Sequence, residues 1–345
     1  MNQFINFMNM KTYNISLITI LVISILFIKT VNSQDVRFSQ PFTVPLNINP
    51  ATMGMYEDAR FMLNSRSQFA DIYRTYAFNG FYPVYYDAQT KNKLDIGISM
   101  IMDEAGAFRD INPLLAISYK LQLSDNNYLT GAISGGVFQK TLNATGLTFD
   151  DQYVVGEFNA SNPTDEIISP ENIIFPDINF GLLWNYRIDE KSETFKNFKE
   201  AFAGISVFHA NEPNESFTGE IGVLPRRFSY HAGIVLTADN RIDVSPNIIS
   251  NYQNGNNDNA IGLYLYYNIN KTQRLVLGSW YRDNDAIALL FKIDFFNFEL
   301  GYAYDIPNSD LGRTLNGMHT HEISLLYKLE VKSLKSPRPD LKSAR

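Results

Sequence analysis

Histidine and carboxylate side chains come together at one place in the sequence, at His319, His321 and Glu322. Imidazole and carboxylate groups can ligate zinc or transfer protons, so this cluster is the first candidate for chemistry. The surrounding pattern is that of a β-strand, in which successive side chains point to opposite faces. The two histidines would then share one face and Glu322 would take the other. With no further histidine nearby, we expect a strand end beside a loop and no metal site.

Other catalytic and cofactor-binding motifs do not occur in the sequence. The chain has no cysteine, which excludes disulfides, thiolate metal sites and cysteine nucleophiles. It has no G-x-S-x-G elbow and no Gly-rich phosphate loop after a strand. The Asn- and Asp-rich stretches 254–258 and 283–285 do not match a calcium loop and are typical of tight turns. We predict that the protein is not an enzyme and needs no cofactor, with a lipase or protease as the least favoured alternative.

The composition argues against nucleic acid as a partner and favours a membrane barrel. A net charge of −7 and a pI of about 5.2 give no basic face for phosphate groups. Aromatic residues make up 14% of the chain and charged residues 19%, yet the mean hydropathy of −0.17 is that of a soluble protein. A membrane barrel reconciles these values, because each strand keeps one polar face in the lumen.

Apolar and polar residues alternate along most of the chain, from about Arg60 to Leu329. This period of two is that of a β-strand with one apolar face. Fourteen such segments, most of 9 to 13 residues and so long enough to cross a bilayer, are centred near residues 64, 79, 98, 117, 133, 180, 205, 233, 247, 264, 278, 290, 302 and 324. We predict an all-β fold, a transmembrane antiparallel up-and-down β-barrel of about 14 strands over residues 60–330. The one possible helical turn is Asp189–Glu200.

The lengths of the connections support this topology. In an up-and-down barrel with both termini in the periplasm, short turns alternate with long external loops. The longest connections, 141–172, 211–226 and 307–318, all follow odd-numbered strands. Aromatic residues near strand ends suit the membrane interface, which favours a membrane barrel over the alternative of a water-soluble β-sandwich. Pro246 lies inside one predicted strand, which we expect to begin late or to carry a bulge.

Charged residues on the predicted inner face carry both signs, namely Asp95, Arg187, Arg282, Lys292, Asp294 and Glu299. Mixed signs favour a lumen closed by ion pairs over a selective pore. The isolated His209 and His231 are expected to occupy polar positions in the same lumen.

The N-terminus has the order of a secretory signal peptide. Lys11 precedes an apolar run over residues 15–28, and Val31-Asn32-Ser33 provides a small residue before Gln34. The run is shorter than the roughly 20 residues of a membrane-spanning helix. We therefore prefer a cleaved signal over residues 1–33 to a membrane anchor.

Two further segments flank the predicted barrel. Residues 34–59 are irregular and rich in proline, and we expect them to be periplasmic or to face the lumen; the sequence leaves open whether they plug it. Residues 331–345 form a basic tail, expected in the periplasm or as a disordered end, whose cationic residues include Lys335, Arg338, Lys342 and Arg345. The start codon, Met1 or Met10, also stays open.

Short motifs in a fixed order run through nearly the whole mature chain. They include Phe38-Ser39-Gln40, Asn49-Pro50-Ala51, Asp103-Glu104-Ala105-Gly106, Gly204 to His209, Ser245-Pro246-Asn247, Gly278 to Arg282, Gly301 to Asp305 and His321 to Leu325. In order and spacing they resemble the PorP/SprF family of type IX secretion proteins. The chain departs from that pattern at Phe42, where tyrosine is expected, in its scarce early tryptophans and in its long basic tail.

The resemblance implies an integral outer-membrane barrel of the type IX secretion and gliding machinery. It would dock or help to export a partner surface protein such as an adhesin, and it would link to periplasmic subunits, including peptidoglycan-associated ones. A passive outer-membrane porin for small solutes is the alternative function. The segment that binds a partner or plugs the lumen would contain Phe38, Ser39, Gln40, Asn49 and Pro50.

Overall fold

The computed structural model describes residues 35–69, 72–87, 89–143, 147–154, 157–159, 162, 172–188, 197–217, 222–309 and 319–331. The predicted signal peptide lies outside the described residues, and so do the tail residues Lys335, Arg338, Lys342 and Arg345. None of the helices in the described part is long and apolar enough to cross a membrane. The compact unit considered below starts at Val36.

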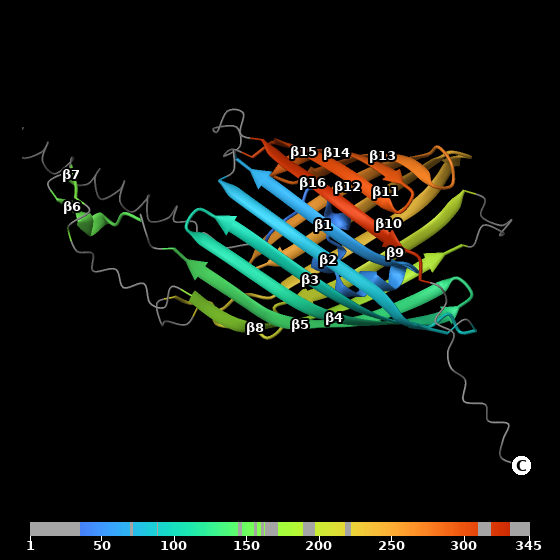
Figure 1. Ribbon diagram of the computed structural model, residues 1–345, viewed down its shortest axis with the longest axis horizontal. Helices are drawn as coiled ribbons and strands as arrows, with labels where there is room; N and C mark the ends of the chain where they lie inside the picture. Colours follow the sequence, from blue (N-terminus) through green and yellow to red (C-terminus); the bar gives the residue numbers. More distant parts are fainter. Residues whose placement is uncertain are drawn as a thin grey trace, which may run out of the picture. The chain divides into compact units, whose positions relative to one another are not determined.

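The described residues form one closed barrel of fourteen antiparallel strands (Figure 1). Its strands are β1 (Ala59–Gln68), β2 (Tyr73–Tyr86), β3 (Lys93–Ala105), β4 (Phe108–Ser124), β5 (Asn127–Leu142), β8 (Asn172–Arg187), β9 (Phe198–Phe208), β10 (Arg227–Asp239), β11 (Ile242–Gln253), β12 (Asn256–Asn268), β13 (Gln273–Arg282), β14 (Ala286–Phe295), β15 (Phe298–Pro307) and β16 (Thr320–Leu329). Two short strands, β6 (Tyr153–Val154) and β7 (Glu157–Phe158), pair only with each other. Every predicted segment coincides with a barrel strand, which confirms the predicted fold class.

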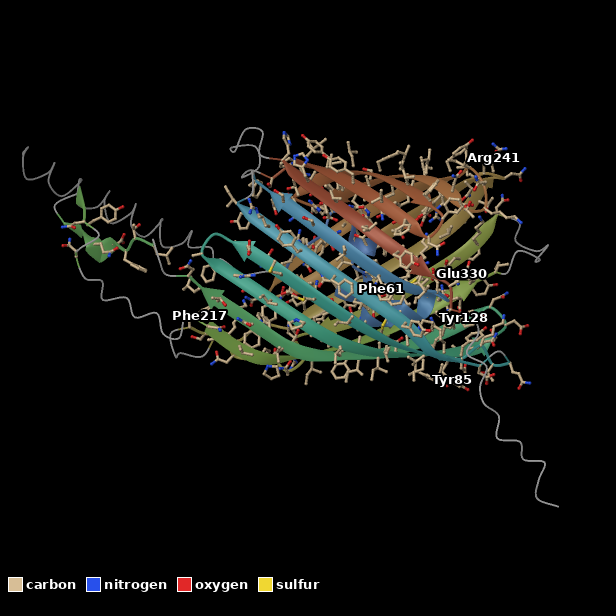
Figure 2. The ribbon with its side chains drawn as sticks, in the orientation of Figure 1. Phe61, Tyr85, Tyr128, Phe217, Arg241 and Glu330 are labelled. Atoms are coloured by element: carbon tan, nitrogen blue, oxygen red, sulfur yellow. The ribbon has the colours of Figure 1, made fainter. Side chains whose placement is uncertain are left out.

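Apolar and polar residues that alternate along a strand lie in turn on the outer and the inner face of the barrel. In β14, buried and exposed residues alternate without a break. Ile287, Leu289 and Phe291 point outward, whereas Lys292 and Asp294 are buried on the inner face. Figure 2 shows side chains such as Phe61 on the outside of the barrel. A closed sheet with an apolar exterior is the arrangement of a membrane barrel and differs from the alternative of a β-sandwich.

The two ends of the barrel are identified by the residues of β1 and β16 that pair there. Ala59 pairs with Leu329 at one end, the near rim, and Gln68 pairs with Thr320 at the other, the far rim. Figure 2 marks the near rim by the labelled residues Tyr85, Tyr128, Arg241 and Glu330. Phe217 lies toward the far rim.

The three longest connections all lie at the far rim, as predicted, and cover 143–171, 209–226 and 308–319. The near rim also has two longer connections, 87–92 and 188–197. The helical turn expected in Asp189–Glu200 falls partly on residues 189–196, outside the described part, and Phe198 to Glu200 belong to β9.

The expectation for Pro246 is wrong. β11 begins before it, at Ile242, and Pro246 pairs with Leu263 of β12 in an unbroken register. Pairing with β10 lapses opposite Pro246 and resumes in the same register at Asn247. Proline lacks only its N–H, so it removes a ladder bond on one side and needs neither a bulge nor a late start.

Candidate functional site

The lumen holds the N-terminal segment Val36–Tyr56, called the plug from here on. It contains three 3-10 helices, η1 (Pro41–Thr43), η2 (Pro45–Asn47) and η3 (Pro50–Met55), and each begins at a proline. Proline suits the first position of a helical turn, because its φ is already fixed and its missing N–H would have no partner there. Several plug residues have no exposed surface at all, among them Gln40, Asn49, Ala51 and Met53.

The plug runs along the lumen from the far rim to the near rim. At the far rim, Arg37 Nε lies 2.7 Å from an Asp258 carboxylate oxygen. At the near rim, the Lys93 ammonium donates to the carbonyl of Met53 at 3.1 Å, and Arg187 donates to that of Met55 at 2.9 Å. The plug therefore enters the lumen at the far rim and reaches β1 at the near rim, where β16 also ends.

Glu322 anchors the start of the plug. Its carboxylate accepts the backbone N–H groups of Ser39, at 2.6 Å, and Gln40, at 3.0 Å. It also accepts the Asn64 amide at 2.9 Å, and Arg66 Nε lies 3.8 Å away. Glu322 is fully buried, so these donors take the place of the water that a carboxylate needs.

A second carboxylate supports the same stretch. The Ser39 hydroxyl donates to Asp305 at 2.7 Å. Arg282 donates to the same oxygen of Asp305 at 2.6 Å, and Arg66 lies 3.6 Å from it. Gln40 accepts the Ser324 hydroxyl at 3.0 Å. The Ser39-Gln40 dipeptide is thus held directly by side chains of β15 and β16, whose carboxylates are in turn held by side chains of β1 and β13.

Asn49 anchors the middle of the plug to β8 and β9, at a place where two glycines leave room for its side chain. Its amide nitrogen donates to the carbonyls of Leu182 in β8, at 3.0 Å, and Ile205 in β9, at 3.2 Å. A Cβ on Gly181 would lie 2.0 Å from Asn49 Oδ1, and one on Gly204 would lie 2.8 Å from its nitrogen. Glycine at both positions leaves the space that Asn49 and Pro50 occupy.

Apolar contacts complete the packing of the plug. The Phe42 ring lies 5.9 Å from that of Trp280 and 6.0 Å from that of Phe202. Tyr56 stacks on Phe81 with ring centroids 5.5 Å apart. Buried apolar residues of the plug and the inner wall form common clusters, so the plug is packed as a core.

The predicted ion pairs of the lumen are confirmed. Asp95 pairs with Lys93 at 3.0 Å, and Arg187 pairs with Glu200 at 2.9 Å. Two further pairs link neighbouring strands, Lys292–Glu299 and Arg274–Asp294, and two reach past one strand to the next, Arg282–Asp305 and Lys328–Asp294.

The histidines do not form a metal site in the described residues. His321 is on the outer face, where its Nδ1 lies 2.8 Å from the Tyr302 hydroxyl, while Glu322 faces the lumen. His209 and His231 are both buried in the lumen, as expected. In the part of the chain that the structure describes, no group of three or more histidine or acidic side chains could hold a metal ion.

Sequence reasoning missed the pair formed by His209 and Asp177. The His209 Nδ1 lies 2.9 Å from an Asp177 carboxylate oxygen, and both side chains are buried. Asp177 also accepts the Asn112 amide at 3.0 Å, and the backbone of His209 donates to Asn179 at 2.9 Å. These bonds tie β8 to β4 and to the start of the 209–226 connection.

Solved structures with this fold are outer-membrane barrels. The TodX deltaS2S3 mutant monoaromatic hydrocarbon channel is 11% identical, with a TM-score of 0.52 over 83% of this chain and 94% of that one. A FadL homologue from Pseudomonas aeruginosa is 9% identical, with a TM-score of 0.49 over 82% and 92% of the two chains. At this identity, the likeness to the TodX channel shows the barrel fold alone.

Sequence comparison identifies the family. No curated protein is similar enough to this chain to serve as a relative. The family model of the type IX secretion system membrane protein PorP/SprF matches residues 30–327, which include the plug and nearly all of the barrel. The chain belongs to the PorP/SprF family of type IX secretion system membrane proteins.

Proposed function

We propose that this protein is a docking component of the type IX secretion machinery in the outer membrane. The far-rim connections would face the cell exterior and meet a secreted surface protein such as an adhesin. The near rim and the basic tail would face the periplasm and meet other subunits of the machinery. This orientation follows the usual rule that the longer loops of such barrels are external.

The observation that carries this proposal is the occupied lumen. A buried segment runs through the barrel and is anchored at Glu322, Asn49 and Lys93. A lumen filled in this way leaves little room for solutes, so the barrel would act through its two ends. No catalytic role is proposed, and serine-directed probes should leave the protein unlabelled.

Deletion of the gene tests the proposal. We expect the deletion strain to lose surface display of one particular large protein while its uptake of small solutes stays unchanged. Surface proteomics and uptake assays measure the two effects, and a plasmid copy should restore display. Normal display in the deletion strain would contradict a docking role.

A passive channel is the second candidate function. The fold is shared with a protein described as a monoaromatic hydrocarbon channel, which favours this alternative. In that case the deletion strain would take up small apolar solutes more slowly and would display its surface proteins normally.

A further inference from the structure

A cavity of about 360 Å³ opens at the near rim, beside the end of the plug. Its wall is rich in cationic and aromatic side chains and contains Lys91, Lys93, Lys120, Arg187, Tyr86 and Tyr128. Glu57 is the acidic side chain in this wall. We call this cavity the cationic pocket.

Two of its cations are almost completely withdrawn from water. The side chain of Lys93 is 1% exposed and that of Lys120 is 5% exposed. Lys93 is held by Asp95, which has no exposed surface and lies behind the wall. Lys120 instead has its ammonium 2.5 Å from the carboxylate of Glu57, inside the pocket. An ammonium group withdrawn from water attracts a carboxylate more strongly than an ammonium group in bulk water does.

Glu57 shows which chemical group the pocket favours. It lies on the linker between η3 and β1, and its side chain is 52% exposed. Burial acts to raise the pKa of Glu57, but Lys120, with Lys93 and Arg187, outweighs it and holds the pKa below the usual value. The pocket thus already stabilises one ionised carboxylate, and that carboxylate belongs to a linker outside the strands.

We propose that the cationic pocket receives a carboxylate side chain from an acidic segment of a partner protein, which takes the place of Glu57 on Lys120. The aromatic rings of Tyr86 and Tyr128 would cover the apolar part of that segment. The chain's own tail after Val331 is rich in cationic residues, so its charge does not complement that of the pocket. This inference deepens the proposed function and rests on it for the identity of the partner, a periplasmic subunit.

Binding of an acidic peptide to the full chain in detergent micelles tests the proposal. The probe is fluorescein-labelled hexaglutamate, followed by fluorescence anisotropy, with hexalysine as the matched peptide. We expect hexaglutamate to bind and hexalysine not to bind. Glu57→Gln removes the resident carboxylate and should tighten binding about fivefold, whereas Lys120→Gln and Lys91→Gln should weaken it about fivefold to tenfold.

Lys271→Gln is the matched control, because Lys271 is an exposed lysine in the near-rim connection 269–272, outside the pocket. Heat-dependent mobility on gels checks that each variant is folded. If Lys120→Gln does not fold, the Lys91→Gln variant, at a half-buried lysine, still tests the proposal.

The proposal is overturned if hexaglutamate binds neither the native chain nor Glu57→Gln. It is also overturned if Lys271→Gln weakens binding as much as Lys91→Gln, or if inorganic phosphate at equal charge displaces the peptide completely. None of these results depends on surface display, so failure here and failure of the docking role can be told apart.

Discussion

At the residue scale, a few buried polar side chains fix the plug in the barrel. Glu322 accepts two consecutive backbone N–H groups of the plug, and Asn49 reaches the carbonyls of two neighbouring strands. Buried groups of this kind are costly to leave without partners. The attachment of the plug should therefore be sensitive to single substitutions at these sites.

Glu322→Gln should loosen the plug. The amide nitrogen of glutamine would face the N–H of Ser39 or Gln40, so one acceptor becomes a donor. We expect a loss of about 2–4 kcal/mol in the stability of the bound plug. Cleavage by chymotrypsin after Phe42, followed by mass spectrometry, should become faster. Glu330→Gln, at an exposed glutamate, should leave the rate unchanged, and equal rates in both variants would contradict the anchoring role.

Gly181→Ala should have a similar effect from the barrel side. The new Cβ would lie 2.0 Å from Asn49 Oδ1, so Asn49 must move and lose its bonds to the strand carbonyls. Each bond contributes about 1 kcal/mol, so cleavage after Phe42 should accelerate. Gly131→Ala is the control, because a Cβ there meets nothing within 4 Å. A Gly181→Ala protein as resistant as Gly131→Ala would rule out this packing.

The sequence predicts which residues face the lumen but does not predict what they bind. Alternation is a local pattern, and it places Glu322 on the face opposite His321, as the structure does. The partner of Glu322 at Ser39 is 283 residues away in the sequence. No sequence pattern near either residue predicts that contact. The contacts of Asn49 with β8 and β9 could not be predicted for the same reason.

At the element scale, the strands and the plug differ in how far they could be predicted. Every strand carries its own alternating pattern, so each of the fourteen could be located from the residues alone. The plug has no such periodicity, and its three turns depend on prolines whose position in space is set by the barrel wall. Its sequence therefore left open a periplasmic or a luminal position.

The linker between the plug and β1 should respond to pH through Glu57. Lys120 and its cationic neighbours outweigh the effect of burial and lower the pKa of Glu57. A carboxylate with a lowered pKa contributes stability above its unfolded pKa and loses that contribution as the pH falls through its folded pKa. The difference in thermal midpoint between the native chain and Glu57→Gln should thus be constant above about pH 5 and vanish at lower pH.

Tryptophan fluorescence in a thermal melt can follow this difference. The effect should be small, at most about 1 kcal/mol, because Glu57 is half exposed. In a Lys120→Gln background, Glu57→Gln should change little at any pH, since the two side chains then no longer form a pair. A difference that persists at acid pH, or in that background, would contradict the role of the pair.

At the scale of the whole molecule, the barrel separates an apolar exterior from a lumen that the plug occupies. The exterior could be predicted from composition and alternation. The direction of the plug could not be predicted from the sequence, because it depends on contacts between distant residues. Arg37 meets Asp258 at the far rim. Lys93 and Arg187 bind the carbonyls of Met53 and Met55 at the near rim.

Conductance in planar lipid bilayers tests the central claim, that the plug closes the lumen of a membrane barrel. The comparison is between residues 34–345 of the chain and a variant of them that lacks residues 38–55, with heat-dependent gel mobility as the check on folding. We expect the full chain to insert without steady conductance and the variant to conduct steadily. Equal, steady conductance from both proteins would contradict the account.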